Sequence, residues 1–189
     1  MENIACVPRP NNVPSPTRFA HAVLNTNDLE AMRKWYSAVL GAETMFANDR
    51  VVFITYDNEH HRIALIKRPN LKPAVQGTVG LDHLAYAYNS LTELVDAYER
   101  LKSAGIVPRS TVNHGPTTSL YYDDPDGNGV ELQVDNFGSV DELNNWFASG
   151  TFSRNQFGAK IDMDDISRRL REGVPEPDLL MPEPEAVEA

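Results

Sequence analysis

Two histidines occupy matching places in a repeated sequence. The stretch 19–29 (FAHAVLNTNDL) recurs as 81–91 (LDHLAYAYNSL), and the alignment places His21 on His83. A carboxylate, Glu131, follows on a later strand of the second copy. Two imidazoles and one carboxylate hold a divalent metal while leaving coordination positions open to substrate and oxygen. The spacing therefore predicts a metal centre at His21, His83 and Glu131.

The alternative to metal binding is that each histidine is an ordinary residue of the protein core. A single histidine on an apolar strand is more often hydrogen-bonded in the core than bound to metal. Core packing, however, gives no reason to select imidazole twice at equivalent positions of a repeat. The duplication therefore favours ligands over core residues.

A fourth position equivalent to the ligands carries a small side chain. The last strands of the two halves align Ala64 with Glu131. If the halves pack about a pseudo-twofold axis, positions 21, 64, 83 and 131 meet, and three of the four are ligand types. A centre with one position left without a donor is open, as a catalytic metal requires.

Each half must be a strand, a helix and three strands to position these residues. Apolar residues alternate with period two in the strands, and Leu29, Met32 and Tyr36 recur at helical spacing before Gly41. We expect strands at 19–24, 43–46, 50–56 and 62–66 around a helix at 29–40, and strands at 81–88, near 106, at 118–122 and at 130–134 around a helix at about 91–104. The predicted fold class is α+β.

The segments outside the repeat have a different character. Residues 1–17 are rich in Pro and Asn and are predicted to form an extended arm. The paired domain covers 18–136, with a first module at 18–75 and a second at 80–136. Residues 137–189 form a C-terminal extension with helices at 140–147 and 164–172, and an acidic, Pro-rich end at 174–189 that we expect to be loosely ordered.

Composition excludes several classes of protein. The 189 residues suffice for one well-buried core, and the net charge of −10 argues against nucleic-acid binding. No apolar run approaches the ~20 residues of a membrane span, and the N-terminus lacks a secretory pattern, so we expect a cytoplasmic protein. The single cysteine, Cys6, fits a reducing compartment and lacks neighbours that would make it a nucleophile.

Several motifs together resemble a known superfamily. The paired modules, the two first-strand histidines and the turn 124–131 (DPDGNGVE) resemble the vicinal oxygen chelate superfamily. Within it, the segment 59–64 (EHHRIA), Tyr121 ahead of the Pro-x-Gly turn, and His114 before that tyrosine resemble the type I extradiol ring-cleaving dioxygenases. The resemblance covers roughly residues 18–136, and the combination is more specific than any one motif.

The resemblance implies a fold and a metal. The fold would be a single barrel of two βαβββ modules followed by the C-terminal extension. The metal would be Fe(II), with Mn(II) as the second choice, bound by His21, His83 and Glu131. The substrates would be a catechol-type aromatic diol and O2, which open the ring beside the diol to a muconic semialdehyde type of product.

The same resemblance implies three catalytic side chains. His61 would be the acid/base, which suits an imidazole near neutral pH. Tyr121 would hydrogen-bond a substrate oxygen, and His114 would orient it or relay a proton. The gap between His114 and Tyr121 is shorter than in the long members, which bears on the role of His114.

Two alternative functions use the same fold. A Mn(II)-dependent thiol transferase of the fosfomycin-resistance type has a similar ligand set but no need of the 60–61 histidine pair. A non-catalytic small-molecule binding protein needs no ligand triad. Glyoxalase-type isomerases need a fourth protein ligand, which Ala64 removes.

The chain has a single barrel, so another segment must complete its site. The apolar residues that follow the last strand are Trp146, Phe147, Phe152 and Phe157. We expect a homo-oligomer in which this segment forms a subunit interface or caps the pocket, with residues 155–158 as the candidate cover.

Overall fold

A computed structural model describes residues 13–72, 75 and 77–180. Cys6, most of the predicted arm and the end of the acidic tail lie outside these residues. No helix of the described part is both long and apolar enough to cross a bilayer.

The first half of the repeat forms a four-stranded sheet in the order β1-β4-β3-β2. Its elements are β1 (Ala22–Thr26), α1 (Leu29–Leu40), β2 (Glu43–Ala47), β3 (Val51–Thr55) and β4 (Ile63–Lys67). Helix α1 begins where the Asp28 side chain accepts hydrogen bonds from two backbone amides, and it ends at Gly41, whose φ of 63° is left-handed. Strand β1 starts later than predicted, because the carbonyls of Phe19 and Ala20 accept hydrogen bonds from Arg62 instead of a neighbouring strand.

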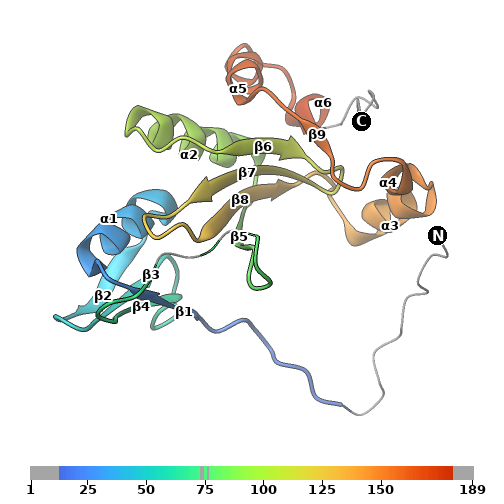
Figure 1. Ribbon diagram of the computed structural model, residues 1–189. Helices are drawn as coiled ribbons and strands as arrows, with labels where there is room; N and C mark the ends of the chain where they lie inside the picture. The colour runs from blue at the N-terminus through green and yellow to red at the C-terminus, as the bar shows by residue number, and fades with distance from the viewer. Residues whose placement is uncertain (1–12, 73–74, 76, 181–189) are drawn as a thin grey trace.

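The second half repeats this arrangement in a five-stranded sheet, in the order β5-β8-β7-β6-β9. Its elements are β5 (His83–Tyr88), α2 (Leu91–Ser103), β6 (Ser110–Asn113), β7 (Thr117–Asp123) and β8 (Gly129–Asp135), with β9 (Ala159–Lys160) added from the extension. The strand predicted near Ile106 begins at Ser110, because the Ile106 amide donates to Leu101 O and closes the end of α2. The α+β architecture of two βαβββ modules is confirmed (Figure 1).

The strand registers confirm that the duplication extends to the backbone. Strands β1 and β4 pair in parallel, as do β5 and β8. Equivalent positions form equivalent pairs, with Val23 opposite Ala64 in the first sheet and Ala85 opposite Glu131 in the second. Ala64 and Glu131 therefore occupy equivalent places in their two sheets.

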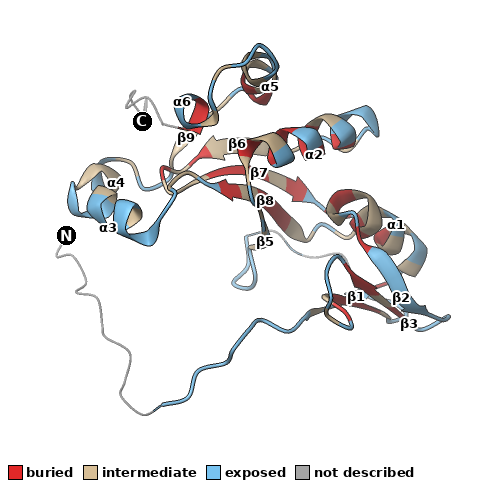
Figure 2. Cartoon of the chain, turned by 180° about the vertical axis from the view of Figure 1, so that it is seen from behind, coloured by how far each residue is buried: buried red, intermediate tan, exposed pale blue. Residues whose placement is uncertain are grey.

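Each sheet packs one face on its own helix. The buried α1 residues Met32, Tyr36 and Val39 share a core cluster with Leu24 and Ile63 of the first sheet. Figure 2 shows buried stretches on α1 and α2 and on strands of both sheets. Successive strand residues point to opposite faces. The predicted site residues that lie on strands, His83, Tyr121 and Glu131, therefore lie on the face turned away from α2, since the chain neighbours of Tyr121 and Glu131 belong to the core cluster.

The C-terminal extension packs on the second module. It contains α3 (Val140–Ala148), α4 (Thr151–Arg154), α5 (Met163–Arg171) and α6 (Glu176–Leu180), and both α5 and α6 contact α2 (Figure 1). The expectation of a loosely ordered end from residue 174 is wrong as far as residue 180, because Leu179 and Leu180 are buried in the core. The Glu176 carboxylate also accepts hydrogen bonds from the first two amides of α2. The homo-oligomer stays a prediction, and Phe157 remains exposed.

Candidate active site

His83 and Glu131 meet on adjacent strands of the second sheet. His83 pairs in register with Gly129 and Ala85 with Glu131, so the two side chains share a face. His83 Nε2 lies 2.8 Å from Glu131 Oε2, and Glu131 is 5% exposed. On the other side of the ring, His83 Nδ1 lies 2.6 Å from Asp82 Oδ2. The imidazole is therefore held between two carboxylates.

This arrangement suits a divalent cation. A ring facing a carboxylate at each nitrogen needs two protons, or one proton and a metal ion in place of the other. Two ligands with metal bonds of about 2.1 Å at a right angle are about 3 Å apart, close to the separation of His83 Nε2 and Glu131 Oε2. Asp82 is placed where a carboxylate would orient His83 if that histidine bound a metal. The hydrogen bond to His83 lowers the pKa of Asp82, so its carboxylate is charged.

A chain of hydrogen bonds continues from Glu131 to His114. Tyr121 Oη donates to Glu131 Oε1 at 3.2 Å, and His114 Nε2 lies 2.8 Å from the same hydroxyl. Tyr121 is the register partner of Glu131 on β7. Burial, with the charge of Glu131, raises the pKa of Tyr121 to about 12, so the phenol stays protonated. The second module thus joins a candidate ligand pair to both predicted second-half catalytic residues.

A second group forms on the first module around His61. The His21 and His61 ring centroids are 4.4 Å apart, and Phe53 stacks on His61 at 4.4 Å with an interplanar angle of 11°. His60 Nδ1 lies 2.6 Å from His61 Nδ1. Burial, with the neighbouring rings of His21 and His60, lowers the pKa of His61. The geometry therefore favours a neutral imidazole, with its plane set by Phe53.

The chain's five histidines all lie in these two groups. The structure brings His21 together with His61, and His83 together with Glu131 and, through Tyr121, with His114. Within residues 13–72, 75 and 77–180, no three His, Cys, Asp or Glu side chains lie close enough together to hold a metal ion. The complete triad therefore stays a prediction.

Arg62 holds the segment that leads to His21, a role that the sequence analysis missed. Its guanidinium donates to Phe19 O at 2.5 Å and Ala20 O at 3.1 Å, and pairs with Asp57 at 2.9 Å. Asp82 and Phe53 were missed as well. Adjacency to His83 was a usable signal for Asp82, and the repeat offered one for Phe53, because it pairs with Ala64 as Tyr121 pairs with Glu131.

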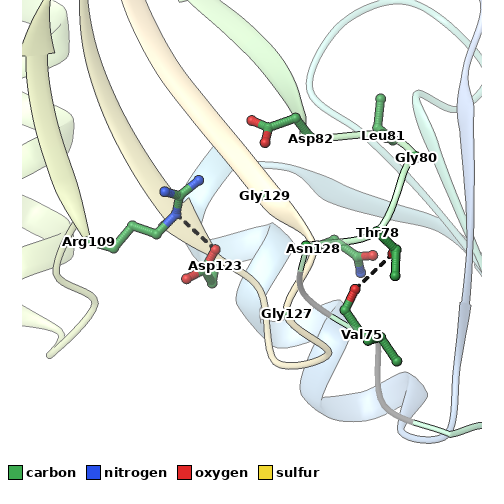
Figure 3. A pocket seen from close by; sticks show the side chains of 11 residues that line it. Val75, Thr78, Gly80, Leu81, Asp82, Arg109, Asp123, Gly127, Asn128 and Gly129 are labelled. Carbon is green, nitrogen blue, oxygen red and sulfur yellow. Dashed lines mark hydrogen bonds and ion pairs between the residues drawn. The ribbon is translucent and has the colours of Figure 1, made fainter.

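A cavity of about 590 Å³ opens at the start of strands β5 and β8. Its lining includes Asp82, which precedes His83 in the chain, and Gly129, the register partner of His83. Arg109 lies on another side, paired with Asp123 at 3.1 Å, while linker residues between the modules form the remaining wall (Figure 3). The cavity therefore lies next to the strand starts that carry the candidate ligand pair, although neither His83 nor Glu131 is among its lining residues.

Comparisons with known proteins agree with this architecture. Residues 18–132 match the model of a family described as the Glyoxalase/Bleomycin resistance protein/Dioxygenase superfamily. The chain is 46% identical over 159 residues to biphenyl-2,3-diol 1,2-dioxygenase 2 of Rhodococcus globerulus, a match covering 84% of each protein. It is 43% identical over 164 residues to biphenyl-2,3-diol 1,2-dioxygenase 3 of the same organism, with 86% of each covered.

Solved structures support the fold. A glyoxylase/bleomycin resistance protein/dioxygenase domain from Frankia sp. EAN1pec superposes with a TM-score of 0.55 at 24% identity. The match covers 66% of this chain and 96% of the Frankia domain. The rest of this chain lies outside the match, so the chain contains residues in addition to the domain that it shares with the Frankia protein.

Proposed function

The chain belongs to the glyoxalase/bleomycin resistance protein/dioxygenase superfamily, and we propose that it cleaves a catechol-type aromatic diol with O2, opening the ring beside the diol at a non-haem Fe(II) centre. The observation that carries the proposal is the identity of 46%, over most of both chains, to a protein named as a dioxygenase of biphenyl-2,3-diol. The hydrogen-bonded series from His83 through Glu131 and Tyr121 to His114 supports it from the side of geometry.

The residues proposed to hold the metal are His21, His83 and Glu131. The bound ion would supply a Lewis-acidic, redox-active centre at which the diol and O2 react. Asp82 would keep the His83 proton on Nδ1 and leave Nε2 as the donor atom. The buried Glu131 carboxylate supports a cation here, because a buried charge is costly unless an opposite charge offsets it.

Three side chains would handle the substrate. His61 is assigned the proton transfer with the diol; because His60 faces its Nδ1, the working nitrogen is Nε2. Phe53 holds the His61 ring plane by stacking. Tyr121 keeps its one proton, which it donates to Glu131 in the structure, and would turn this proton to a substrate oxygen when Glu131 binds the metal. His114, which is hydrogen-bonded to the same hydroxyl, would orient it.

The test begins with metal and proceeds to turnover. Protein reconstituted anaerobically with Fe(II) is analysed for iron and then given a panel of catechols, including biphenyl-2,3-diol, in air. We expect one iron per chain and a yellow ring-opened product. Binding of no catechol, together with Mn(II)-dependent addition of a thiol to an epoxide, would contradict the proposal and favour the thiol transferase.

A variant of His61 distinguishes catalysis from the binding of iron and catechol. His61→Ala is expected to retain iron and bind catechol anaerobically, yet to turn over about 100- to 10,000-fold more slowly, the range of general acid/base groups. Tyr121→Phe should lose less, because it removes one hydrogen bond worth about 1–3 kcal/mol. Full turnover by His61→Ala would exclude it as the acid/base.

A further inference from the structure

We propose that the C-terminal extension positions His114, so that residues 137–180 are part of the working site and not only a cover for α2. The inference rests on the proposed function, which gives His114 its catalytic role. His114 lies in the turn between β6 and β7, and its amide donates to Thr117 O at 2.8 Å. Three separate parts of the extension contact this turn.

The first contact is the indole of Trp146 on α3. Gly115 adopts a left-handed φ of 92°, and a Cβ atom there would collide with the Trp146 ring. The ring is itself supported by Phe137, Phe147 and Phe152, with centroid distances of 5.7, 5.3 and 5.9 Å. The residue next to His114 is therefore packed against an aromatic cluster of the extension.

The second contact is the backbone of Gly158, ahead of β9. A Cβ atom at Gly158 would lie 2.8 Å from His114 Cα and would also collide with Asn113 O. Strand β9 then pairs with β6, with Ala159 opposite Asn113. This close approach explains why the loop has glycine where it passes His114.

The third contact ties the turn to α6. Asn113 is buried, and its Nδ2 donates to Leu180 O at 2.8 Å. Its Oδ1 accepts from Gly115 N at 2.8 Å and from Asn136 Nδ2 at 3.0 Å. One side chain therefore links the turn, the end of the second module and the last described helix.

These contacts converge on a short hydrogen bond. His114 Nε2 lies 2.8 Å from Tyr121 Oη, so a shift of the turn by about 1 Å would break it. A misplacement of that size far from the chemistry can cost about 100-fold in rate. The extension acts through His114, which makes Trp146 and Gly158 positioning residues.

The test compares two glycines with the same backbone strain. Gly158→Ala pushes on His114, whereas Gly150→Ala, in the same extension with φ of 76° against 79°, meets nothing within 4 Å. In protein with ¹⁵N-labelled histidine rings, the His114 signals are assigned by their loss in His114→Gln. We expect Gly158→Ala to move these signals and to lower kcat about 10- to 100-fold with KM nearly unchanged, and Gly150→Ala to leave both as in the wild type.

A second set of variants, on α3, tests the proposal in case Gly158→Ala does not fold. Trp146→Ala should move the His114 signals, Trp146→Phe should restore them in part, and Val140→Ala, at an exposed residue of the same helix, should leave them in place. Unchanged His114 signals in both Gly158→Ala and Trp146→Ala would overturn the proposal, as would moved signals with unchanged kcat. If the wild type opens no catechol, the proposed function fails separately, and the ring signals alone decide whether the extension positions His114.

Discussion

The Tyr36–Asp124 hydrogen bond joins the two modules and can be tested quantitatively. Tyr36 is 0% exposed, and its Oη donates to Asp124 Oδ2 at 3.0 Å, from α1 to the turn before β8. Burial raises the pKa of Tyr36, so the phenol remains the donor across the working pH range. Tyr36→Phe removes a hydrogen bond to a charged acceptor, worth about 1.5–3 kcal/mol. Asp124 keeps its bonds from Asp126 N and from two Asn128 donors, so we expect a loss of about 2 kcal/mol in the free energy of unfolding.

The repeat provides a matched control in Tyr98, the equivalent residue of α2. Its hydroxyl donates at 2.8 Å to Asp164, whose side chain is 64% exposed and also pairs with Lys102. Solvent and the second partner reduce the value of this bond, so Tyr98→Phe should cost less than about 1 kcal/mol. Urea denaturation measures both, and thermal unfolding should show a fall of about 4–8 °C for Tyr36→Phe. Equal losses in the two variants would refute the argument from burial.

Three further predictions concern the proposed metal ligands and the C-terminal extension. Arg62→Met frees the carbonyls ahead of His21 and should weaken Fe(II) binding about 10- to 100-fold in an anaerobic titration, as for other groups that orient a ligand; wild-type affinity would contradict it. Fe(II) at 100 times its Kd should stabilise the wild type by about 2.7 kcal/mol but not Glu131→Gln, and equal thermal shifts would exclude Glu131 as a ligand. For Glu176, burial opposes ionisation, but hydrogen bonds from Thr92 and Leu91 outweigh it and lower the pKa. Its stabilisation is therefore present above the unfolded pKa of about 4.3 and is lost as pH falls through the lowered folded value, so Glu176→Gln should lower the melting temperature at pH 7 and lessen its fall towards pH 3.

The fold was predictable because the repeat and the helix signals are local. Gly41 ends α1 in the sequence as in the structure, and the equivalent registers follow from equivalent strand patterns. The predicted element bounds were wrong where contacts between residues far apart in the sequence determine the local structure. Arg62 donates hydrogen bonds to the carbonyls of the two residues ahead of His21, so β1 begins later than predicted. Burial of Leu179 and Leu180 stabilises α6 in a segment whose composition is polar.

The candidate site was predictable only in part, for the same reason. The repeat identifies His83 and register identifies Glu131, because both positions follow from strand alternation. The contacts of Trp146 and Gly158 with the His114 turn depend on how the extension folds back over β6. No spacing in the chain encodes that return, so sequence reasoning could only predict that some segment must complete the site.

The differences between the halves follow the proposed chemistry. Backbone pairing keeps Phe53 opposite Ala64 and Tyr121 opposite Glu131 in equivalent places. The hydroxyl and the carboxylate occur only in the second half, where they hydrogen-bond to each other; in the first half the ring without a hydroxyl stacks on His61. Since sheet register depends on the backbone and the helix-facing residues, the opposite face could diverge without loss of the fold. The second half would thus supply the carboxylate and the hydroxyl of the proposed site, and the first half, besides the proposed ligand His21, an aromatic wall for the imidazole proposed to transfer the proton.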